Sequence, residues 1–461
     1  MAQFAHGTPS SLQILTNPTI GGTNIVAKVF LTSPAPAGGE VVTLTSDATV
    51  STLPTSVTVP QGATVKAFSF TPDGVDASST FALHATSGGV TVDQNLTVNP
   101  ASLISFSFGP NSVIGGVNTS GVVTLNGYAG PSGTVISLMN GSPKVVLPAT
   151  ATVPYNTKTK ASTVITGGVA STTPTTNFAH QGAQPTLSGN LTLNPASLYS
   201  LTLNSTSVVG GNNVILTARL DGTAPAGGVV VPLSTSTPGV NLPASVTIPA
   251  GKVAGAVSFN PVGVDAAVVA TLSGTMVNTK TVDLTINPAK FVSFYFDPGY
   301  VVGGNNRSGV VVLNGLAGPS GYLVDLNCGN ANVSMPPNVT VLSQARRAAV
   351  TATTKGVNAG EDVYFLNVHC SGSAGGITVL DTLHLQPSLV TATADHDQVT
   401  GGSDVVVTLR LNGKSGPPGV TFTLSSNSPH ATCPASVHMP PQTQAMTFTV
   451  HTTAVSSPTP V

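Results

Sequence analysis

One short segment of the sequence carries residue types that bind phosphate in other proteins. Gly413-Lys414-Ser415 matches the last three residues of a phosphate-binding loop. That loop needs a further glycine upstream, where this chain has Thr408, and the segment falls between two expected strands instead of before a helix. The sequence contains no Gly-x-Ser-x-Gly elbow and no His-Glu-x-x-His motif. It therefore predicts no catalytic residue and no cofactor site, and indicates that the protein is not an enzyme.

Carboxylates and imidazoles are the other groups that could do chemistry, as metal ligands. Asp395, Asp397 and Asp404 cluster near the start of the last repeat, and Ca²⁺ takes about six to eight oxygen ligands. The other repeats lack this cluster, which favours ordinary turn aspartates and leaves calcium as the weaker alternative. Three histidines occupy similar late strands without a second ligand type nearby: His84, His180 and His369. We expect these to be partly exposed strand histidines.

The sequence has three cysteines, too few to staple every repeat as in a small disulfide scaffold. Cys328 and Cys370 both fall in the fourth repeat, on segments that could lie side by side in one sheet. A disulfide and a pair of buried thiols are both compatible with this placement. Cys433 has no partner in its own repeat.

Composition excludes several classes of function. Charged residues make up 7% of the 461 residues and the net charge is −1, so no field attracts the chain to nucleic acid or anionic lipid. Apolar residues alternate with Thr, Ser, Asn and Gly, and no run reaches the ~20 apolar residues of a membrane helix. A surface of hydroxyls and amides favours an extracellular or cell-surface location. Residues 1–7 do not read as a signal peptide, so we expect a trimmed start or a segment of a longer chain.

The elements that would position any site come from a five-part repeat. Its signature is an apolar residue, Gly-Gly, any residue, then Asn or Asp, with a looser fifth copy that begins at Thr400. The first glycines lie 94, 95, 93 and 98 residues apart, at Gly21, Gly115, Gly210, Gly303 and Gly401. A repeat of ~100 residues can bury a core of its own, so each copy is predicted to be a domain. Because Gly tolerates positive φ, the signature is expected to be a turn or bulge between strands.

Each repeat shows period-2 alternation rich in Val and Thr, with turn signals every ~8–12 residues. No stretch has convincing helical periodicity with caps. The sequence thus predicts an all-β protein of tandem antiparallel β-sandwiches that form an elongated rod. A proline-bracketed strand stands late in each repeat, as in Leu53 to Pro60. Proline lacks an N–H group, so this strand is expected at a sheet edge.

A second period lies over the first. Repeats one and three share Ala-Pro-Ala-Gly-Gly at one turn, and repeats two and four share Phe-rich opening strands, such as residues 105–108. The order is therefore A-B-A-B, followed by a mixed fifth unit. Two explanations remain open: the two types face different surroundings, or a pair of domains was duplicated in tandem. The phenylalanines of the opening strands, Phe106, Phe108, Phe294 and Phe296, are expected in the core.

The joints predict the domain boundaries. We expect domains at residues 11–100, 101–196, 197–289 and 290–387, and an incomplete fifth domain at 388–461 that lacks its final two strands. Residues 1–10 read as the tail of a strand and as a candidate donor strand. An unfinished sandwich exposes core and unpaired edges, so a neighbouring chain could supply what is missing; truncation of a longer repeat protein is the alternative.

The repeat resembles the bacterial Ig-like domains found in tandem in large surface proteins. The resemblance rests on the Gly-Gly-x-Asn turn, the Pro-Ala-Gly-Gly turn, the Leu-Pro-x-Ser-Val-Thr-Val-Pro strand and the Asn-Pro-Ala-Ser joint. It implies a structural subunit or segment of an extracellular filament, stalk or surface layer that self-associates, without nucleic acid or membrane insertion. The alternative is an adhesin or carbohydrate-binding module with a glycan or surface ligand.

Overall fold

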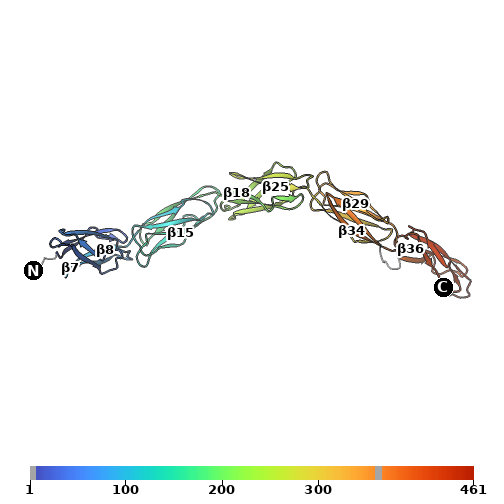
Figure 1. The fold of residues 1–461 in the computed structure, drawn as a ribbon, viewed down its shortest axis with the longest axis horizontal. Coiled ribbons are helices and arrows are strands. Elements are labelled where there is room, and N and C mark those ends of the chain that lie inside the picture. Colours follow the sequence, from blue (N-terminus) through green and yellow to red (C-terminus); the bar gives the residue numbers. More distant parts are fainter. Residues whose placement is uncertain (1–6, 359–365) are drawn as a thin grey trace.

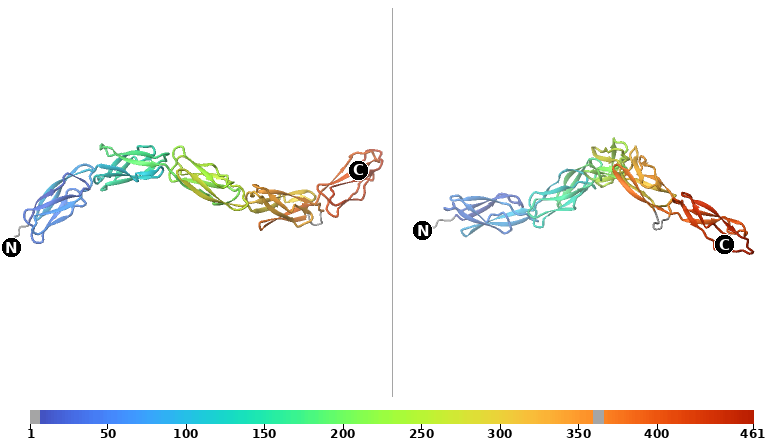
Figure 2. Two further views of the ribbon diagram at one scale, coloured as in Figure 1. Left: turned by 90° about the horizontal axis from the view of Figure 1, so that it is seen from above. Right: turned by 45° about the vertical axis from the view of Figure 1, so that its right-hand side comes forward.

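A computed structural model describes residues 7–358 and 366–461 of the chain. Within these residues every regular element is a β-strand, and the strands form five sandwiches that follow one another in an elongated, curved row (Figures 1 and 2). The prediction of an all-β protein built from tandem sandwiches is confirmed. We call the sandwiches domains 1 to 5 and define each by its strands, while the residue boundaries between them stay a prediction. None of the described elements is a helix of the length and apolarity that crossing a membrane requires.

Domains 1 and 3 share one topology. Domain 1 consists of β1 (Pro9–Ile14), β2 (Thr19–Ile20), β3 (Ile25–Leu31), β4 (Glu40–Ser46), β5 (Ser56–Val59), β6 (Val65–Phe70), β7 (Ser79–Ser87) and β8 (Val90–Asn99). Domain 3 consists of β18 (Leu198–Leu203), β19 (Ser207–Val209), β20 (Val214–Leu220), β21 (Val229–Thr235), β22 (Ser245–Ile248), β23 (Ala254–Phe259), β24 (Val268–Thr275) and β25 (Thr279–Asn287). In domain 1 a three-stranded sheet, β1-β3-β6, faces a five-stranded sheet, β2-β8-β7-β4-β5. The short β2 runs parallel to β8, and the other neighbours are antiparallel.

Domains 2 and 4 add a two-residue strand to the smaller sheet. Domain 2 consists of β9 (Leu103–Gly109), β10 (Ser112–Ile114), β11 (Thr119–Leu125), β12 (Thr134–Met139), β13 (Val145–Val146), β14 (Thr150–Val153), β15 (Thr159–Thr166), β16 (Thr173–His180) and β17 (Leu187–Asn194). Domain 4 consists of β26 (Phe291–Phe296), β27 (Tyr300–Val302), β28 (Asn306–Leu313), β29 (Tyr322–Cys328), β30 (Val333–Ser334), β31 (Asn338–Val341), β32 (Arg347–Thr354), β33 (Leu366–Ala374) and β34 (Ile377–Gln386). The added strands are β13, which pairs with β15, and β30, which pairs with β32. The A-B-A-B alternation of the sequence therefore has a counterpart in the sheets.

The proline-bracketed strands lie where the sequence predicts them. β5, β14, β22 and β31 each end the order of their five-stranded sheet. At this position a strand needs a hydrogen-bonded neighbour on one side alone, so flanking prolines interrupt no second ladder. The prediction of an edge position is confirmed.

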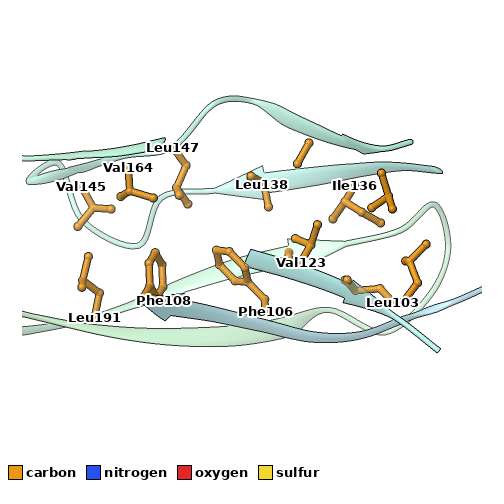
Figure 3. Packing of buried hydrophobic residues seen from close by; sticks show 14 of the residues in the cluster. Leu103, Phe106, Phe108, Val123, Ile136, Leu138, Val145, Leu147, Val164 and Leu191 are labelled. Carbon is orange, nitrogen blue, oxygen red and sulfur yellow. The ribbon is translucent and has the colours of Figure 1, made fainter. Parts of the chain in front are cut away.

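Alternation along the strands fills one core per sandwich. In domain 2 the side chains of Phe106 and Phe108 point from β9 between the sheets, with Leu138 and Val164 among their neighbours (Figure 3). Phe106 and Phe108 lie with ring centroids 5.0 Å apart, and Phe294 and Phe296 of domain 4 lie 5.3 Å apart. All four rings are buried, which confirms them as core residues.

Domain 5 differs from the other four. It consists of β35 (Val390–Ala394), β36 (Asp404–Leu411), β37 (Val420–Thr423), β38 (Ala431–Thr432), β39 (Ser436–Met439) and β40 (Ala445–Thr452). Its smaller sheet is whole, with the order β35-β36-β40-β38, but β37 and β39 alone stand where domains 1 to 4 have five strands. Within the described residues its core cluster has three buried members, Leu409, Leu411 and Met439. The second layer of this sandwich is therefore largely open.

Candidate functional site

The Gly-Gly signature forms the turn that joins each domain to the next. Its second glycine has positive φ in all five copies, from 77° at Gly22 to 96° at Gly304, which is the conformation that the sequence predicts for glycine. Its first glycine offers a carbonyl to the following domain. Backbone N–H groups of the next domain donate to these carbonyls at 2.7–2.9 Å, in the pairs Tyr128 to Gly21, Thr223 to Gly115, Leu316 to Gly210 and Lys414 to Gly303. The same backbone contact thus recurs at four joints.

Glycine is also required where the two domains touch. Just before each N–H donor stands a glycine whose Cβ would lie closer than 3.0 Å to the carbonyl oxygen of the preceding Gly-Gly turn: Gly127, Gly222, Gly315 and Gly413. On the preceding domain, four further glycines pack as closely on backbone carbonyl oxygens of the next domain: Gly74, Gly168, Gly263 and Gly356. Real Cβ atoms essentially never approach backbone this closely, so side chains at these positions would push the domains apart.

Polar side chains reinforce the first and third joints. Asp76 of domain 1 accepts hydrogen bonds from the backbone N–H and the hydroxyl of Ser132, the latter at 2.9 Å. Asp265 of domain 3 accepts the same pair from Ser320 of domain 4, again at 2.9 Å from the hydroxyl. We call this contact the aspartate–serine clamp. Charged acceptors make such bonds stronger than neutral ones.

A second polar contact uses a residue with positive φ. Asn156 (φ 55°) accepts a hydrogen bond from the Gly74 N–H at 2.8 Å, and Gln344 (φ 61°) accepts one from the Gly263 N–H at 2.8 Å. Gln442 (φ 62°) accepts from the Gly356 N–H at 3.1 Å in the fourth joint. We call these side chains amide caps.

The joint between domains 2 and 3 has neither contact. Ala170 stands at the place of Asp76, and Gly251 (φ 71°) stands at the place of Asn156. Beyond the backbone bond between Thr223 and Gly115, the Thr223 hydroxyl adds a long bond of 3.5 Å to the same carbonyl. The fourth joint instead has Asn358, whose amide nitrogen donates to the carbonyls of domain 5, the shortest at 3.0 Å to Gly419. The joints therefore differ in their polar contacts while sharing one backbone geometry.

An open trough in domain 5 is the second candidate interaction surface. Its volume is about 1330 Å³, and its walls come from the inner face of β36 and β40 and from the loops around β38. Apolar side chains that would be core in a closed sandwich line it, among them Val405, Val407, Leu424, Phe448 and Val450. Apolar surface of this kind is usually covered in a soluble protein. The trough occupies the space that the last two strands fill in domains 1 to 4.

The candidate donor segment, residues 1–10, divides into described and undescribed parts. Residues 1–6 lie outside the described residues. Pro9 and Ser10 belong to β1, and Pro9 pairs with Leu31 of the same domain. The donor role of this segment stays a prediction.

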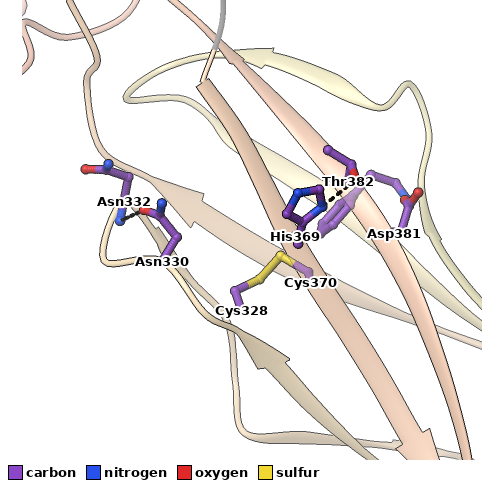
Figure 4. The surroundings of a disulfide bond; sticks show 8 residues. Cys328, Asn330, Asn332, His369, Cys370, Asp381 and Thr382 are labelled. Carbon is purple, nitrogen blue, oxygen red and sulfur yellow. Dashed lines mark hydrogen bonds between the residues drawn. A yellow bond between two sulfur atoms is a disulfide. The ribbon is translucent and has the colours of Figure 1, made fainter.

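The two cysteines of domain 4 are joined. Cys328 on β29 and Cys370 on β33 face each other across two paired strands, with their Cα atoms 4.1 Å apart, and form a disulfide (Figure 4). The sequence placed these segments side by side without deciding between a disulfide and thiols. Cys433 is free, half-buried, and lies on the wall of the trough in domain 5.

Two of the three aspartates considered as calcium ligands, Asp395 and Asp404, have separate partners. Asp395 accepts a hydrogen bond from the Val406 N–H at 3.0 Å, and Asp404 pairs with His451 at 2.7 Å. Among the described residues, no three His, Cys, Asp or Glu side chains come together as metal ligands. The calcium interpretation therefore has no geometric support among the described residues.

One histidine has an environment that the sequence did not reveal. The two ring nitrogens of His84 on β7 bond to Asp93 at 2.6 Å and to Asp47 at 2.9 Å. The bonds to Asp93 and Asp47 raise the pKa of His84 above its usual value of 6.5. The bond to His84 in turn lowers the pKa of Asp47. His369 bonds to the Thr382 hydroxyl at 2.9 Å (Figure 4).

The chain was compared with known proteins. No family model matches it, and no curated protein matches it. Among solved structures it is similar to invasin, a bacterial integrin-binding protein, with 13% identity, a TM-score of 0.27, and coverage of 85% of this chain and 81% of that chain. An ICAM-5 D1–D4 ectodomain fragment is 14% identical, with a TM-score of 0.23 and coverage of 82% and 99%. Drosophila OTK extracellular domains 3–5 are 10% identical, with a TM-score of 0.26 and coverage of 62% and 99%.

The sheet order of the domains defines their fold. In domain 1 β1, β3 and β6 share one sheet. In the other sheet β7 pairs with β4, and the last strand, β8, pairs with β7. This division of strands is that of the immunoglobulin sandwich. Domains 2 to 4 repeat it, and in B-type domains a short extra strand extends the smaller sheet. The chain is a tandem array of Ig-like β-sandwich domains.

Proposed function

We propose that this chain is a structural rod in an extracellular filament, stalk or surface layer, and that a neighbouring chain completes its fifth domain. The observation that carries the proposal is the contrast between four closed, docked sandwiches and one open sandwich at the end of the row. Backbone bonds at every joint support a spacer role, because they hold neighbouring domains at fixed places. A disulfide and a surface poor in charge are in keeping with an extracellular setting.

Completion would proceed by strand addition. In domains 1 to 4 the strand that corresponds to β37 has a second neighbour: β7, β16, β24 or β33. In domain 5 the described strands leave this edge of β37 without a neighbour, and the apolar trough begins at Leu424, the residue after β37. An incoming hairpin would bond to the edge through its backbone and place alternate side chains in the trough. These are the roles that β33 and β34 have in domain 4.

A peptide added in trans tests this proposal. The probe is residues 173–194, the hairpin of β16 and β17 from domain 2, which lacks cysteine. We expect it to slow amide hydrogen exchange in β37, and a scrambled peptide of the same composition to have no effect. Raising the concentration of the chain alone should protect the same amides if a second copy is the natural donor.

Two outcomes would contradict the proposal. In one, β37 exchanges at the same rate with and without the hairpin peptide. In the other, a dilute chain that sediments as a monomer already protects β37 as fully as domain 4 protects β29. Either result would leave a rod of docked domains without strand exchange.

A further inference from the structure

The four internal joints follow one rule for the residues that meet. The following domain supplies a glycine and then an N–H group that bonds to the carbonyl of the Gly-Gly turn. The preceding domain supplies a second glycine, which packs on a carbonyl of the following domain. Every internal joint satisfies all three conditions, although the side chains around them differ.

The end of domain 1 that faces away from domain 2, which we call its outer pole, does not meet the first two conditions. Two backbone bonds fix the equivalence with domain 2: Thr32 to Thr8 corresponds to Asn126 to Ser102, and Ala35 to Ala63 corresponds to Ala129 to Thr157. Between these bonds domain 2 has Gly127 and Tyr128, whereas domain 1 has Ser33 and Pro34. Ser33 brings a Cβ to the place where it would meet a carbonyl, and Pro34 has no N–H to donate.

The outer pole of domain 5, which faces away from domain 4, does not meet the third condition. Its Gly-Gly turn is formed as in domains 2 and 4, with the Gly402 N–H donating to the Thr452 hydroxyl at 3.0 Å. The corresponding bonds are Gly116 to Thr166 and Gly304 to Thr354, both 2.9 Å. Two residues after this threonine, domains 2 and 4 have Gly168 and Gly356, but domain 5 has Ala454. Its methyl group occupies the space that a carbonyl of a following domain would need.

We infer that both poles of the array are closed to the joint that holds its domains together, so that a second copy of this chain does not stack end to end through it. Each closure uses a residue that the internal joints cannot tolerate. The inference concerns the poles alone and is independent of strand addition in domain 5, which uses the open face of the sandwich and not its pole.

The rule for internal joints can be tested by placing the residues of the outer pole of domain 1 at the joint between domains 1 and 2. The variant Gly127→Ser with Tyr128→Pro gives domain 2 the residues that domain 1 carries in a closed sandwich, so domain 2 should still fold. We expect the joint between domains 1 and 2 to open, with faster exchange of the Gly74 amide and a wider spread of angles between these domains in electron micrographs. Gly329→Ser is the matched control, because a Cβ there meets nothing within 4 Å.

The wild-type chain provides the second measurement. Electron micrographs over a range of concentrations should contain no pairs in which domain 5 of one rod continues into domain 1 of another. The inference is wrong if such end-to-end pairs appear, or if the double variant keeps the Gly74 amide protected and the angle between domains 1 and 2 unchanged. If copies instead pair side by side, or through the trough of domain 5, while no end-to-end pairs appear, the result supports the inference that the outer poles are closed.

Discussion

At the scale of single residues, His84 offers a pH-dependent contact. Its imidazole lies between the carboxylates of Asp93 and Asp47. Because the folded pKa of His84 is raised above 6.5, these pairs contribute fully below pH 6.5, and the contribution is lost as pH rises through the folded pKa. The lowered pKa of Asp47 reflects the same pair with His84, which is lost again when the solution becomes acidic enough to protonate Asp47.

An NMR titration checks this prediction. The His84 ring signals should titrate with a midpoint above 6.5 in the wild-type protein, and Asp93→Asn should move the midpoint down, since Asp93 is the largest cause of the raised pKa. A midpoint that is the same in both proteins would contradict the assigned cause. Asp283→Asn, on a strand of domain 3, is a control that should leave the His84 midpoint unchanged.

The disulfide leads to a second prediction at this scale. Cys328 and Cys370 are 42 residues apart in sequence, and cross-links of this kind typically contribute about 2–4 kcal/mol by restricting the unfolded chain. Reduction should lower the denaturant midpoint of domain 4 accordingly, followed through hydrogen exchange of β29 and β33. Domain 2 has the same topology without cysteines and should not change. An equal effect on both domains would point to a general action of the reductant.

At the scale of elements, the joints differ in how firmly they are held. The joints between domains 1 and 2 and between domains 3 and 4 have the aspartate–serine clamp and an amide cap, whereas the joint between domains 2 and 3 has neither. Domains 2 and 3 are therefore expected to have the widest range of relative orientations. Small-angle scattering and particle classes in electron micrographs measure this range directly.

A reciprocal pair of substitutions tests the role of the amide cap. Gly251 already has the positive φ that Gln344 adopts, so Gly251→Gln should place an amide beside the Gly168 N–H and narrow the motion of domains 2 and 3. Gln344→Gly removes the cap between domains 3 and 4 and should widen theirs. If both variants keep the wild-type distribution of angles, the cap has no part in stiffening the joints.

Much of each element could be predicted from the sequence, because the signals are local. The alternation of apolar and polar residues predicted the strands, and the flanking prolines predicted the edge position of β5 and its counterparts. The paired glycines predicted the turn with positive φ. The joints could not be predicted, since they connect residues such as Gly21 and Tyr128 that lie in different repeats. The requirement for glycine at Gly74 or Gly127 arises only when a second domain stands against it. The environment of His84 could not be predicted either, because Asp93 lies on β8 and Asp47 lies in the loop after β4.

At the scale of the whole molecule, the A-B-A-B order coincides with the pattern of contacts. Each A domain presents an aspartate to the B domain that follows it, through Asp76 and Asp265. The B domain in the middle presents Ala170 to the A domain that follows. The row therefore consists of two clamped pairs, domains 1–2 and 3–4, joined by a joint that has no clamp. This supports the view that the two domain types face different surroundings within the chain itself.

The parallel pairing of the short second strand with the last strand has a consequence when the rod is stretched. Both strands run toward the same end of the domain, but the chain enters at β2 and leaves at β8. Tension along the chain therefore slides β2 past β8 and loads their hydrogen bonds together, in shear. Domains 2, 3 and 4 have the same pairing through β10, β19 and β27. Domain 5 has no such pair among its described strands. In single-molecule pulling, domain 5 should yield first, and the four others should unfold later, at higher force.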